Sequence, residues 1–425
     1  PGVHEFNYPA FLREDNHMSK PIRVMQIIAR MNVGGPAVIV ADLMRGLDKR
    51  DFDQRLVTGF CAPDEADYLD QVAIDVKAQK INGLGRSISP LQDLQSFLKL
   101  LRIIRQFKPD IIHTHTAKAG VLGRIAGLIA YPKASRIHTF HGHLLNGYFN
   151  GLKTKLVIVT EKFLAYGTDL LLAVGNQVRQ DLLKAGIGNE SKFKVSFPGL
   201  PVLERTSKLK AREILGLNQE ITYLVFVGRL TGIKRPDRLI ALGRELKATN
   251  IRAEILVAGE GELFASTQEI SEREALPIVF LGWRTDIDLI LSASDIALLC
   301  SDNEGIPLTL IQASQAGLPI VSTDVGSVSD IVVNGITGFL TEVSSKGLIE
   351  GVSALLDDSA LGMRLGKAGQ ERAQEFLNKF QEVYLASDDD KYVIATVIRM
   401  IVSSPDLVYL TETDLLDLAD NISKL

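Results

Sequence analysis

The stretch "IRVMQIIARMNVGGPAVIVADLMRGL" (residues 22–47) contains the repeating unit of the fold. It begins with a nearly continuous apolar run, which is typical of a buried strand. A glycine-rich turn follows, and Pro36 then opens a segment that is expected to be helical, because proline is well tolerated in the first turn of a helix. A buried strand followed directly by a helix is typical of a parallel sheet with helices on both faces.

The same alternation of strand and helix continues along the chain. Apolar runs predict further strands in the first half at residues 52–60, 110–116, 136–142 and 170–175. The alternation restarts after residues 196–202, with expected strands at residues 221–230, 253–261, 278–283, 296–301 and 319–326. The sequence therefore predicts an α/β protein with two doubly wound, Rossmann-like domains that face each other across a cleft.

Length and composition narrow the class of protein. A chain of 425 residues is long for one domain, and 46% hydrophobic with 23% charged residues is typical of a soluble globular protein. The net charge of −4 gives no reason to expect nucleic-acid binding, and no apolar run is long enough to span a bilayer. Only Cys61 and Cys300 occur, far apart, so no disulfide or zinc framework is expected and a cytoplasmic location is favoured.

The two ends of the chain do not follow the alternating pattern. Residues 1–17 lack the pattern of a signal peptide and Met18 reads as a natural start, so we expect residues 1–17 to be an added tag. We expect the N-terminal domain at residues 18–198 and the C-terminal domain at residues 199–375. Residues 376–425 would form a further C-terminal helical segment.

A pair of glycines follows the first expected strand. Ligands of doubly wound sheets bind outside the carboxyl ends of the strands, which makes this turn a candidate site. Gly34 and Gly35 precede a helix and would let backbone N–H groups approach an anion. A tight turn with no binding role would use the same two residues.

Two cations follow a strand of the second half. Arg229 and Lys234 could clamp a diphosphate, with the arginine contributing a bidentate contact and the lysine a compact charge. The alternative is a solvated basic loop, and this is what we expect of Arg235 and Arg238.

Histidines concentrate at the ends of two expected strands. Five of the seven histidines lie in residues 113–116 and 138–143. No matching carboxylate motif stands beside them, so packing or hydrogen bonding is the expectation for most of them rather than metal binding. His141, followed by Gly142 in a turn, is the candidate to face the cleft.

One acidic pair, Asp286 and Asp288, has a spacing that holds a divalent metal in some transferases. Helix capping explains both residues, with Thr285 as the expected N-cap. We therefore predict no metal site there.

Residues 301–321, "SDNEGIPLTLIQASQAGLPIV", carry two polar side chains at a strand-to-helix junction. Pro307 suits the first position of a helix, which leaves Glu304 in the preceding loop and Gln312 one and a half turns into the helix. The free N–H groups of the first turn could bind phosphate oxygens. Alternatively, Glu304 is a solvated loop residue and Gln312 belongs to the helix surface.

Taken together, these motifs resemble the retaining glycosyltransferases of the GT-B fold, and specifically glycosyltransferase family 4. The resemblance covers roughly residues 22–375 and rests on the ordered motifs "NVGG", "HTHTAKAGVLGR", "HTFHGH", "VGRLTGIKRPDRLI", "VAGEGEL", "FLGWRTDI" and "EGIPLTLIQASQAGLPIVSTDVG". The histidine motifs are similar to those of bacterial members that build surface polysaccharides. The resemblance implies an acceptor-binding N-terminal domain and a C-terminal domain that binds the nucleotide sugar.

The resemblance also implies a role for each matching residue. The residues implied at the donor sugar are His141, Glu304, Gly305 and Ile306. The residues implied at the donor diphosphate are Gly34, Gly35, Arg229 and Lys234, together with the amides of Leu308 and Thr309. The nucleoside would be held by Trp283, Arg284 and Gln312. The catalytic candidates are His141, Glu304, Arg229 and Lys234.

Two residues depart from the pattern of the family. Gln312 stands where the family has a second acid that binds the ribose hydroxyls; an amide can still bind a hydroxyl, but it loses the stronger charged acceptor, a difference of about 1 kcal/mol. Pro307 stands where many relatives have a glycine, and proline has no N–H to offer to the sugar. The identity of the donor sugar therefore does not follow from the resemblance.

The implied activity is transfer of a sugar, with retention, from a nucleotide-diphosphate sugar to a hydroxyl acceptor in cell-surface polysaccharide or glycolipid synthesis. A UDP-sugar is the favoured donor, and neither a cofactor nor a metal ion is expected. The acceptor, a sugar or a lipid-linked sugar, could meet Lys118 and Arg124, although two cations on one helix are also typical of a protein surface. The expected location is the cytoplasm, with a peripheral contact at the inner face of the plasma membrane.

Two alternatives stay open. The chain could be a non-catalytic subunit that binds a nucleotide sugar, with Gln312 as the mark of lost chemistry. It could also be a sugar-nucleotide epimerase, since these enzymes share the GT-B fold.

Overall fold

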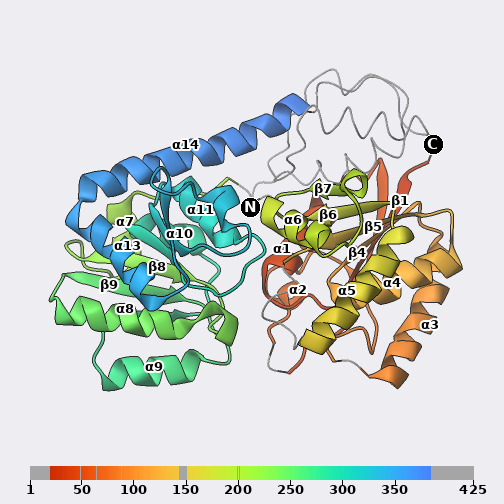
Figure 1. The fold of residues 1–425 in the computed structure, drawn as a ribbon, viewed down its shortest axis with the longest axis horizontal. Coiled ribbons are helices and arrows are strands. Elements are labelled where there is room, and N and C mark those ends of the chain that lie inside the picture. The colour runs from red at the N-terminus through yellow and green to blue at the C-terminus, as the bar shows by residue number, and fades with distance from the viewer. Residues whose placement is uncertain are drawn as a thin grey trace.

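The computed structural model describes residues 20–383, apart from residues 48, 64, 88, 143–150, 199 and 201. The expected tag at residues 1–17 and the part of the C-terminal segment at residues 384–425 lie outside the described residues. Within the described part of the chain, the strands form a seven-stranded and a six-stranded sheet. Each sheet has helices on both faces, and the two lie side by side in Figure 1.

The first sheet has the strand order β3-β2-β1-β4-β5-β6-β7, and every neighbouring pair is parallel. Its strands are β1 (Ile22–Ile28), β2 (Phe52–Thr58), β3 (Ala78–Lys80), β4 (Ile111–His115), β5 (Ser135–Phe140), β6 (Leu170–Ala173) and β7 (Phe193–Val195). Its helices are α1 (Gly35–Gly46), α2 (Tyr68–Gln71), α3 (Pro90–Phe107), α4 (Ala117–Ala130), α5 (Gly151–Tyr166), α6 (Asn176–Lys184) and the short η2 (Glu190–Lys192). Apolar side chains of α1 and α2 pack on one face of this sheet, and those of α3 and α4 pack on the other.

The second sheet has the order β10-β9-β8-β11-β12-β13 and is also parallel throughout. Its strands are β8 (Thr222–Val227), β9 (Ala253–Ala258), β10 (Ile278–Gly282), β11 (Ile296–Leu299), β12 (Ile320–Thr323) and β13 (Gly338–Thr341). Its helices are α7 (Lys208–Leu215), η3 (Gly232–Lys234), α8 (Pro236–Ala248), α9 (Phe264–Arg273), α10 (Ile287–Ala293), α11 (Leu308–Ala316), α12 (Val328–Ile331), α13 (Ser345–Asp357) and α14 (Ser359–Val383). One core contains side chains of α8 and α13, and the other contains side chains of α10 and α11.

The strands expected from the sequence are all present, and the two-sheet architecture is confirmed. Three further strands, β3, β7 and β13, were not expected. All three lie at the edges of their sheets and are only three or four residues long. A short edge strand buries few side chains and therefore lacks the long apolar run by which a central strand is recognised.

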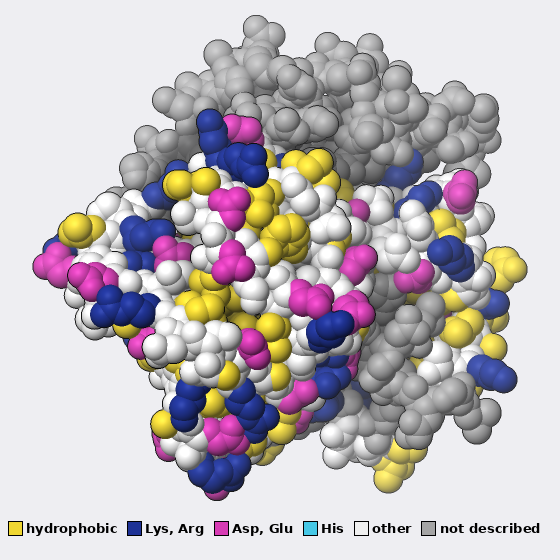
Figure 2. Space-filling view, turned by 60° about the vertical axis from the view of Figure 1, so that its left-hand side comes forward, with side chains coloured by type: hydrophobic (Ala, Val, Ile, Leu, Met, Phe, Trp, Pro, Cys, Tyr) yellow, Lys and Arg dark blue, Asp and Glu magenta, His cyan; other side chains and the backbone are white. Residues whose placement is uncertain are grey.

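The surface carries both signs of charge. Figure 2 shows basic and acidic side chains interspersed over the face that it presents. The mixture agrees with the small net charge of −4, and on this face no large patch of one sign is available to attract a polyanion.

The two domains contact each other directly. The backbone N–H of Asn176, at the start of α6, donates to Asp330 Oδ2 at 2.7 Å, and its side-chain amide donates to Asp330 Oδ1 at 3.0 Å. The N–H of Val178 lies 3.4 Å from the hydroxyl oxygen of Ser327. These bonds join the start of α6, in the N-terminal domain, to the loop and helix that follow β12 in the C-terminal domain.

Candidate functional site

The predicted site residues follow the central strands of both sheets. In each sheet the strand order reverses at one place, between β1 and β4 in the first and between β8 and β11 in the second. Connections leave such neighbouring strands in opposite directions, and ligands of doubly wound sheets bind there. The Gly34–Gly35 turn follows β1, Arg229 follows β8, and Glu304 follows β11.

Lys234 and Glu304 form an ion pair between two strand-end loops. Lys234 Nζ lies 2.6 Å from Glu304 Oε1, and the hydroxyl of Ser301 donates to the same oxygen at 2.5 Å. The side chain of Glu304 is 9% exposed and that of Lys234 is 22% exposed. Glu304 is therefore not a solvated loop residue. The structure brings these two predicted site residues into direct contact.

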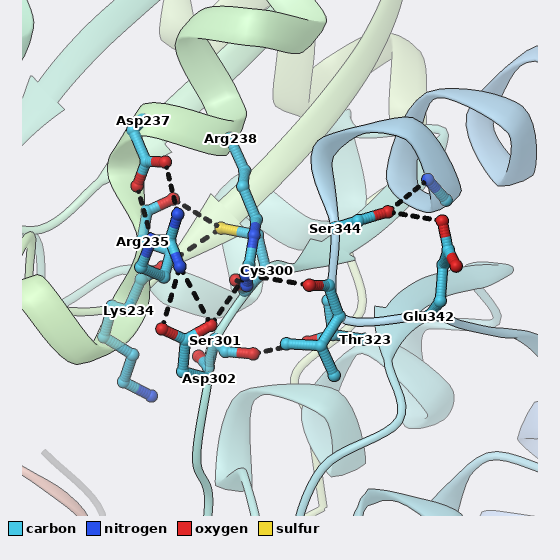
Figure 3. A network of polar contacts seen from close by, with 12 residues as sticks. Lys234, Arg235, Asp237, Arg238, Cys300, Ser301, Asp302, Thr323, Glu342 and Ser344 are labelled. Carbon is cyan, nitrogen blue, oxygen red and sulfur yellow. Dashed lines mark hydrogen bonds and ion pairs between the residues drawn. The ribbon is translucent and has the colours of Figure 1, made fainter. Parts of the chain in front are cut away.

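The loop that carries Glu304 is fixed by Asp302. The guanidinium of Arg235 donates to both carboxylate oxygens of Asp302, and Arg238 Nη2 donates to Oδ1 at 2.6 Å. Arg238 also donates to the backbone carbonyl of Cys300 at 2.6 Å. Figure 3 shows the two arginines converging on Asp302, with Lys234 extending away from them. The expectation that Arg238 is a solvated surface cation is wrong, because this side chain is buried.

Cys300 joins the two loops through its thiol. Its Sγ donates to the backbone carbonyl of Lys234 at 3.1 Å. Burial raises the pKa of this thiol to about 12, so it stays protonated and acts as a donor. On the other side, the hydroxyl of Thr323 donates to the carbonyl of Ser301 at 2.7 Å. The Lys234 and Glu304 loops are thus held in register by contacts outside their own ion pair.

Helix α11 begins immediately after this loop. Its first residue is Leu308. Pro307, which was expected at the first position of the helix, is instead the N-cap and has an extended conformation, so the helix begins one residue later than expected. The N–H groups of Leu308 and Thr309 have no partner within the helix because they precede its first hydrogen-bonded turn. The Gly34–Gly35 turn lies opposite, since a Cβ built on Gly35 would be 3.8 Å from Leu308 Cδ1. Two predicted phosphate contacts from different domains thus meet at the start of α11.

His141 and Gly305 touch across the domain boundary. A Cβ built on Gly305 would lie 2.1 Å from the backbone oxygen of His141, so only glycine allows this approach. A Cβ built on Gly142 would lie 3.6 Å from Gly305 Cα. His141, which follows β5, is therefore placed next to the Glu304 loop, as its predicted role at the donor sugar requires. The neighbouring Ile306 is partly buried and packs against the core clusters of both domains.

The four histidines of the described chain form a buried polar layer and are not grouped with acidic ligands. His113, His115 and His138 are at most 3% exposed. Burial lowers the pKa of His113 to about 3 and that of His141 to about 4, and the pKa of His115 and of His138 lies well below the ordinary value for the same reason. These imidazoles are neutral at pH 7. Within the described residues, no three His, Cys, Asp or Glu side chains are grouped so that they could hold a metal ion.

The predicted nucleoside-binding residues lie at the end of β10. The backbone N–H of Trp283 is 3.4 Å from Glu260 Oε1. Arg284 makes two hydrogen bonds to Asp286, at 2.8 and 2.5 Å, and this contact lowers the pKa of the Asp286 carboxyl. The side chain of Gln312, on α11, is partly buried and makes no hydrogen bond to another described residue. Its amide is therefore available to a ligand.

The expected cap of α10 is corrected by the structure. Asp286, and not Thr285, occupies the N-cap position, and no side chain forms a capping hydrogen bond. The carboxylate is instead engaged by Arg284, which explains the acidic residue without a metal ion.

The two cations predicted to meet an acceptor have different surroundings. Arg124 is 2% exposed and lies 2.6 Å from Glu161, inside the packing of α4 against α5. The prediction that Arg124 meets the acceptor is therefore wrong. Lys118 is nearer the surface but is bound by Asp93 at 2.6 Å and by the carbonyl of Ser87.

Arg229 differs from Arg124 and Lys118, whose side chains are both held in ion pairs. It is exposed and makes no hydrogen bond or ion pair with another described residue. The loop beside it is held by the N–H of Leu230, which donates to the carbonyl of Glu260 at 3.0 Å. Arg229 is therefore free to bind a ligand.

Several residues of this region were not recognised from the sequence. Ser301 and Asp302 position the Glu304 loop, and Glu260 connects the end of β9 to Trp283. Arg30, just after β1, pairs with the nearly buried Glu65 at 2.7 Å. Single polar residues in loops give no periodic signal, although the positions of Arg30, Glu260, Ser301 and Asp302 just after strands could have indicated them.

Two parallel-sheet domains joined in this way, with a cation, a carboxylate and a free helix start where their strand ends meet, define the GT-B class of sugar transferases. The profile described as "Glycosyltransferase Family 4" matches residues 33–200, and the profile "Glycosyl transferases group 1" matches residues 207–372. The chain belongs to glycosyltransferase family 4 and is a glycosyltransferase.

Bacterial glycosyltransferases are similar to this chain over most of its length. It is 29% identical over 335 residues to the UDP-Gal:alpha-D-GlcNAc-diphosphoundecaprenol alpha-1,3-galactosyltransferase of Escherichia coli, which covers 75% of this chain and 83% of that protein. It is 26% identical to the capsular polysaccharide biosynthesis glycosyltransferase CapM of Staphylococcus aureus, over 80% of this chain and 90% of CapM.

Solved structures share the fold. The Anabaena protein HepE in complex with UDP-glucose superposes with a TM-score of 0.70 at 20% identity, over 95% of this chain and 100% of that one. WaaG, a glycosyltransferase involved in lipopolysaccharide biosynthesis, superposes with a TM-score of 0.66 at 16% identity, over 83% and 95% of the two chains. The GT-B architecture expected from the sequence is confirmed.

Proposed function

We propose that this glycosyltransferase moves a sugar from a UDP-sugar to a hydroxyl of a lipid-linked acceptor in bacterial surface-polysaccharide synthesis, with retention and without a metal ion. The contact of Lys234 with Glu304 carries the proposal, because it places a cation and a sugar-binding acceptor together beside the free start of α11. The name of the E. coli relative specifies a UDP-sugar and a diphosphoundecaprenol acceptor, and the HepE complex contains UDP-glucose. Both support a UDP-sugar as the donor.

The proposed chemistry breaks the bond between the anomeric carbon and the diphosphate oxygen. A bond to the acceptor oxygen forms on the same face of the sugar, and the acceptor's proton passes to the departing phosphate oxygen. Negative charge that accumulates on the diphosphate would be stabilised by Arg229, Lys234 and the amides of Leu308 and Thr309. Lys234 and Ser301 both contact Oε1 of Glu304, so Oε2 is the oxygen offered to a sugar hydroxyl.

The proposed site needs no divalent cation at the diphosphate. Two cationic side chains and the first amides of α11 supply the positive charge that a metal ion supplies in other transferases. A chelator should therefore leave the rate of transfer unchanged. A rate that falls in EDTA and recovers on addition of Mg²⁺ or Mn²⁺ would contradict this part of the proposal.

Gln312 would contact the ribose, and Trp283 with Arg284 would lie at the base. Gln312 keeps a free amide that can both accept from and donate to a hydroxyl. The guanidinium of Arg284 is held by Asp286, so its backbone and its aliphatic stem are the parts most available to a nucleobase.

A peripheral membrane contact is part of the proposal, with the enzyme on the cytoplasmic side of the plasma membrane. Helix α5 exposes Leu156, Val159, Phe163 and Tyr166, whose spacing of three and four residues places them on one side of the helix. The exposed side chains of Lys155 and Lys162 lie on the same side. An apolar helix face with lysines suits the interface of an anionic bilayer.

The membrane contact can be tested by flotation with vesicles of phosphatidylglycerol and phosphatidylcholine. The double variant Phe163→Ser/Tyr166→Ser should bind these vesicles more weakly, while transfer to a soluble acceptor stays the same. Ile336→Ser, at an exposed apolar residue of the other domain, is the matched control. No binding of the wild type to anionic vesicles would refute the contact. No described helix is both long enough and apolar enough to cross a bilayer.

The central experiment screens UDP-, GDP- and ADP-sugars for thermal stabilisation and then for turnover. A ligand present at 100 times its Kd stabilises the folded state by about 2.7 kcal/mol, and a UDP-sugar should give the largest rise in Tm. With a diphosphate-lipid acceptor, the enzyme should release UDP. The transferred sugar should keep the anomeric configuration that it has in the donor, as NMR of the product would show. A non-catalytic subunit would be stabilised without releasing UDP, and an epimerase would convert the sugar without any acceptor.

A further inference from the structure

A line of polar side chains crosses the buried centre of the first sheet. Gln26 of β1 lies opposite His113 of β4, and His115 of β4 lies opposite Thr139 of β5. Side chains on neighbouring strands in register share one face, and every second residue of a strand returns to it. Gln26 of β1, His115 of β4 and His141, which directly follows β5, therefore lie in sequence on the same face of the sheet.

Two hydrogen bonds join these three side chains. His115 Nε2 lies 2.9 Å from Gln26 Oε1, and His115 Nδ1 lies 2.9 Å from His141 Nε2. Gln26 and His115 are fully buried, where a polar group without a partner is costly. At one end of the chain of hydrogen bonds His141 Nδ1 is buried and has no partner among the described residues, and at the other end the same is true of Gln26 Nε2.

The chain of hydrogen bonds has a direction because a neutral imidazole has one donor and one acceptor. With Gln26 Oε1 as the acceptor, His115 carries its proton on Nε2. His115 Nδ1 then accepts from His141 Nε2–H, and His141 Nδ1 is left with a lone pair. Burial keeps the pKa of both histidines far below 7, so no imidazolium interrupts this order at neutral pH.

We propose that Gln26 and His115 are positioning residues that hold His141 in the Nε2–H tautomer, so that its Nδ1 lone pair accepts from a hydroxyl of the donor sugar. The inference rests on the proposed function, because it takes the donor sugar to lie between His141 and Glu304. The backbone of His141 touches Gly305, the residue next to Glu304. A lone pair beside a sugar that develops positive charge is stabilising, whereas an N–H dipole there would oppose the charge.

The reverse order of donors and acceptors would follow if the Gln26 amide were turned by 180°. Its NH₂ would then donate to His115, His115 would donate to His141 Nε2, and His141 Nδ1 would carry a proton. The two arrangements differ in one observable property, the nitrogen of His141 that is protonated. That property can be measured without any substrate.

The test is a two-bond ¹H–¹⁵N correlation spectrum of the full chain with ¹⁵N-labelled histidine at pH 7.5. The His141 signals are assigned by their loss in His141→Gln. We expect Nε2 at the shift of a protonated nitrogen and Nδ1 at the shift of an unprotonated one. A protonated Nδ1, or two equally populated tautomers, in the wild type would overturn the proposal even if every variant misfolds.

Two variants then connect the tautomer to the reaction. Gln26→Met removes the acceptor at nearly constant volume and should give a mixture of His141 tautomers, with kcat about tenfold lower and little change in KM for the UDP-sugar. Thr139→Val is the matched control, because Thr139 lies on the same face but bonds His113 at 2.7 Å and stands outside the chain of hydrogen bonds. Thr139→Val should keep both the tautomer and kcat.

The results separate this proposal from the proposed function. If folded Gln26→Met keeps the single Nε2–H tautomer of His141, then Gln26 does not set that tautomer, and the positioning role is refuted whatever the donor is. If the His141 tautomer changes in Gln26→Met but the protein binds no UDP-sugar, the positioning role of Gln26 is supported and the assignment of the donor is refuted.

Discussion

Lys234 Nζ and Glu304 Oε1 lie 2.6 Å apart, although the two residues follow different strands and are 70 positions apart in the chain. Glu304 also accepts from Ser301, and its side chain is nearly buried. Removing one partner of a pair withdrawn from water leaves the other charge uncompensated. Each residue therefore depends on the other for its position and for its charge.

Substitution at this pair should lower turnover strongly. Glu304→Gln keeps the shape but loses a charged acceptor, which should reduce kcat/KM by about 10- to 100-fold. Lys234→Ala removes a stabilising charge at the leaving diphosphate, with a loss of about 10²- to 10³-fold in kcat. Initial rates of UDP release measure both effects.

The control for these variants is Arg244→Ala. Arg244 lies on α8, close to Lys234 in the chain, but pairs with Glu274 at an exposed position. Its loss should change the rate by less than about twofold, because exposed ion pairs contribute little. Wild-type rates for Lys234→Ala would show that the diphosphate does not bind here.

Arg229 should matter for binding and not for folding. It is exposed and makes no polar contact with another described residue, so Arg229→Ala should leave Tm unchanged. Loss of a bidentate contact to a phosphate should raise KM for the UDP-sugar about tenfold, since a charge-assisted hydrogen bond contributes about 1.5 kcal/mol. Steady-state kinetics and a thermal melt of the same preparation test both statements.

Arg252→Ala is the comparison for Arg229. Arg252 is also exposed, and its side chain pairs with the exposed Glu220. If the two variants had the same KM as the wild type, Arg229 would be a solvated loop residue after all.

Much of this architecture could be predicted from the sequence. The central strands are nearly continuous apolar runs, which is why β1 and β8 were found, and residues directly after them are natural site candidates. Glu304 and Lys234 were placed in one site through the order of their motifs. Their mutual contact was not predicted, because it depends on how two loops pack.

Other features depend on three-dimensional context and could not be predicted. Arg124 and Arg238 have the same sequence signature as surface cations, and only the packing of α4 on α5 and of α8 on the β11 loop shows that they are buried. Gly305 looks like any loop glycine until the opposite domain is placed against it. Contacts between elements distant in the chain leave no local pattern in a single sequence.

Gly305→Ala should impair the reaction without unfolding the protein. Its Cβ would meet the backbone oxygen of His141 at 2.1 Å, so the two domains would have to separate locally by about 1 Å, a displacement that can cost about 100-fold in rate. Each domain keeps its own core, and Tm should change little. The measurement is kcat together with a thermal melt.

Gly362→Ala is the control for steric effects. Its Cβ would meet only Pro319 Cγ at an ordinary contact distance of 3.8 Å, and alanine is favoured over glycine within a helix. This variant should be as active as the wild type and slightly more stable. Full activity of Gly305→Ala would mean that the contact with His141 is not needed during turnover.

Stability should fall as the pH is lowered from about 6.5. Burial holds the pKa of His113 at about 3 and that of His115 and His138 well below the ordinary value. Below pH 6.5 the unfolded chain binds protons at these positions and the folded chain does not, so each histidine removes about 1.4 kcal/mol of stability per pH unit. The loss continues until the folded pKa is reached.

Urea unfolding at pH 7.5, 6.5 and 5.5 measures this slope. His113→Phe should give a shallower slope than the wild type, since one proton is removed from the difference between the folded and unfolded states. An unfolding free energy that stays constant between pH 7.5 and 5.5 would show that the folded protein binds as many protons as the unfolded chain, which contradicts lowered pKa values for these histidines.

The buried pair of Arg124 and Glu161 should support stability and leave the chemistry untouched. The two side chains are each 2% exposed and lie 2.6 Å apart, so Glu161→Leu would leave a buried guanidinium without its partner, at a cost of about 3–5 kcal/mol. The double variant Arg124→Met/Glu161→Leu removes both charges and should recover most of the stability. Urea unfolding compares the two, and kcat/KM for the acceptor, measured at a temperature where both are folded, should equal the wild-type value. A rise in KM for the acceptor alone in the double variant would show that Arg124 contributes to acceptor binding although its side chain is buried.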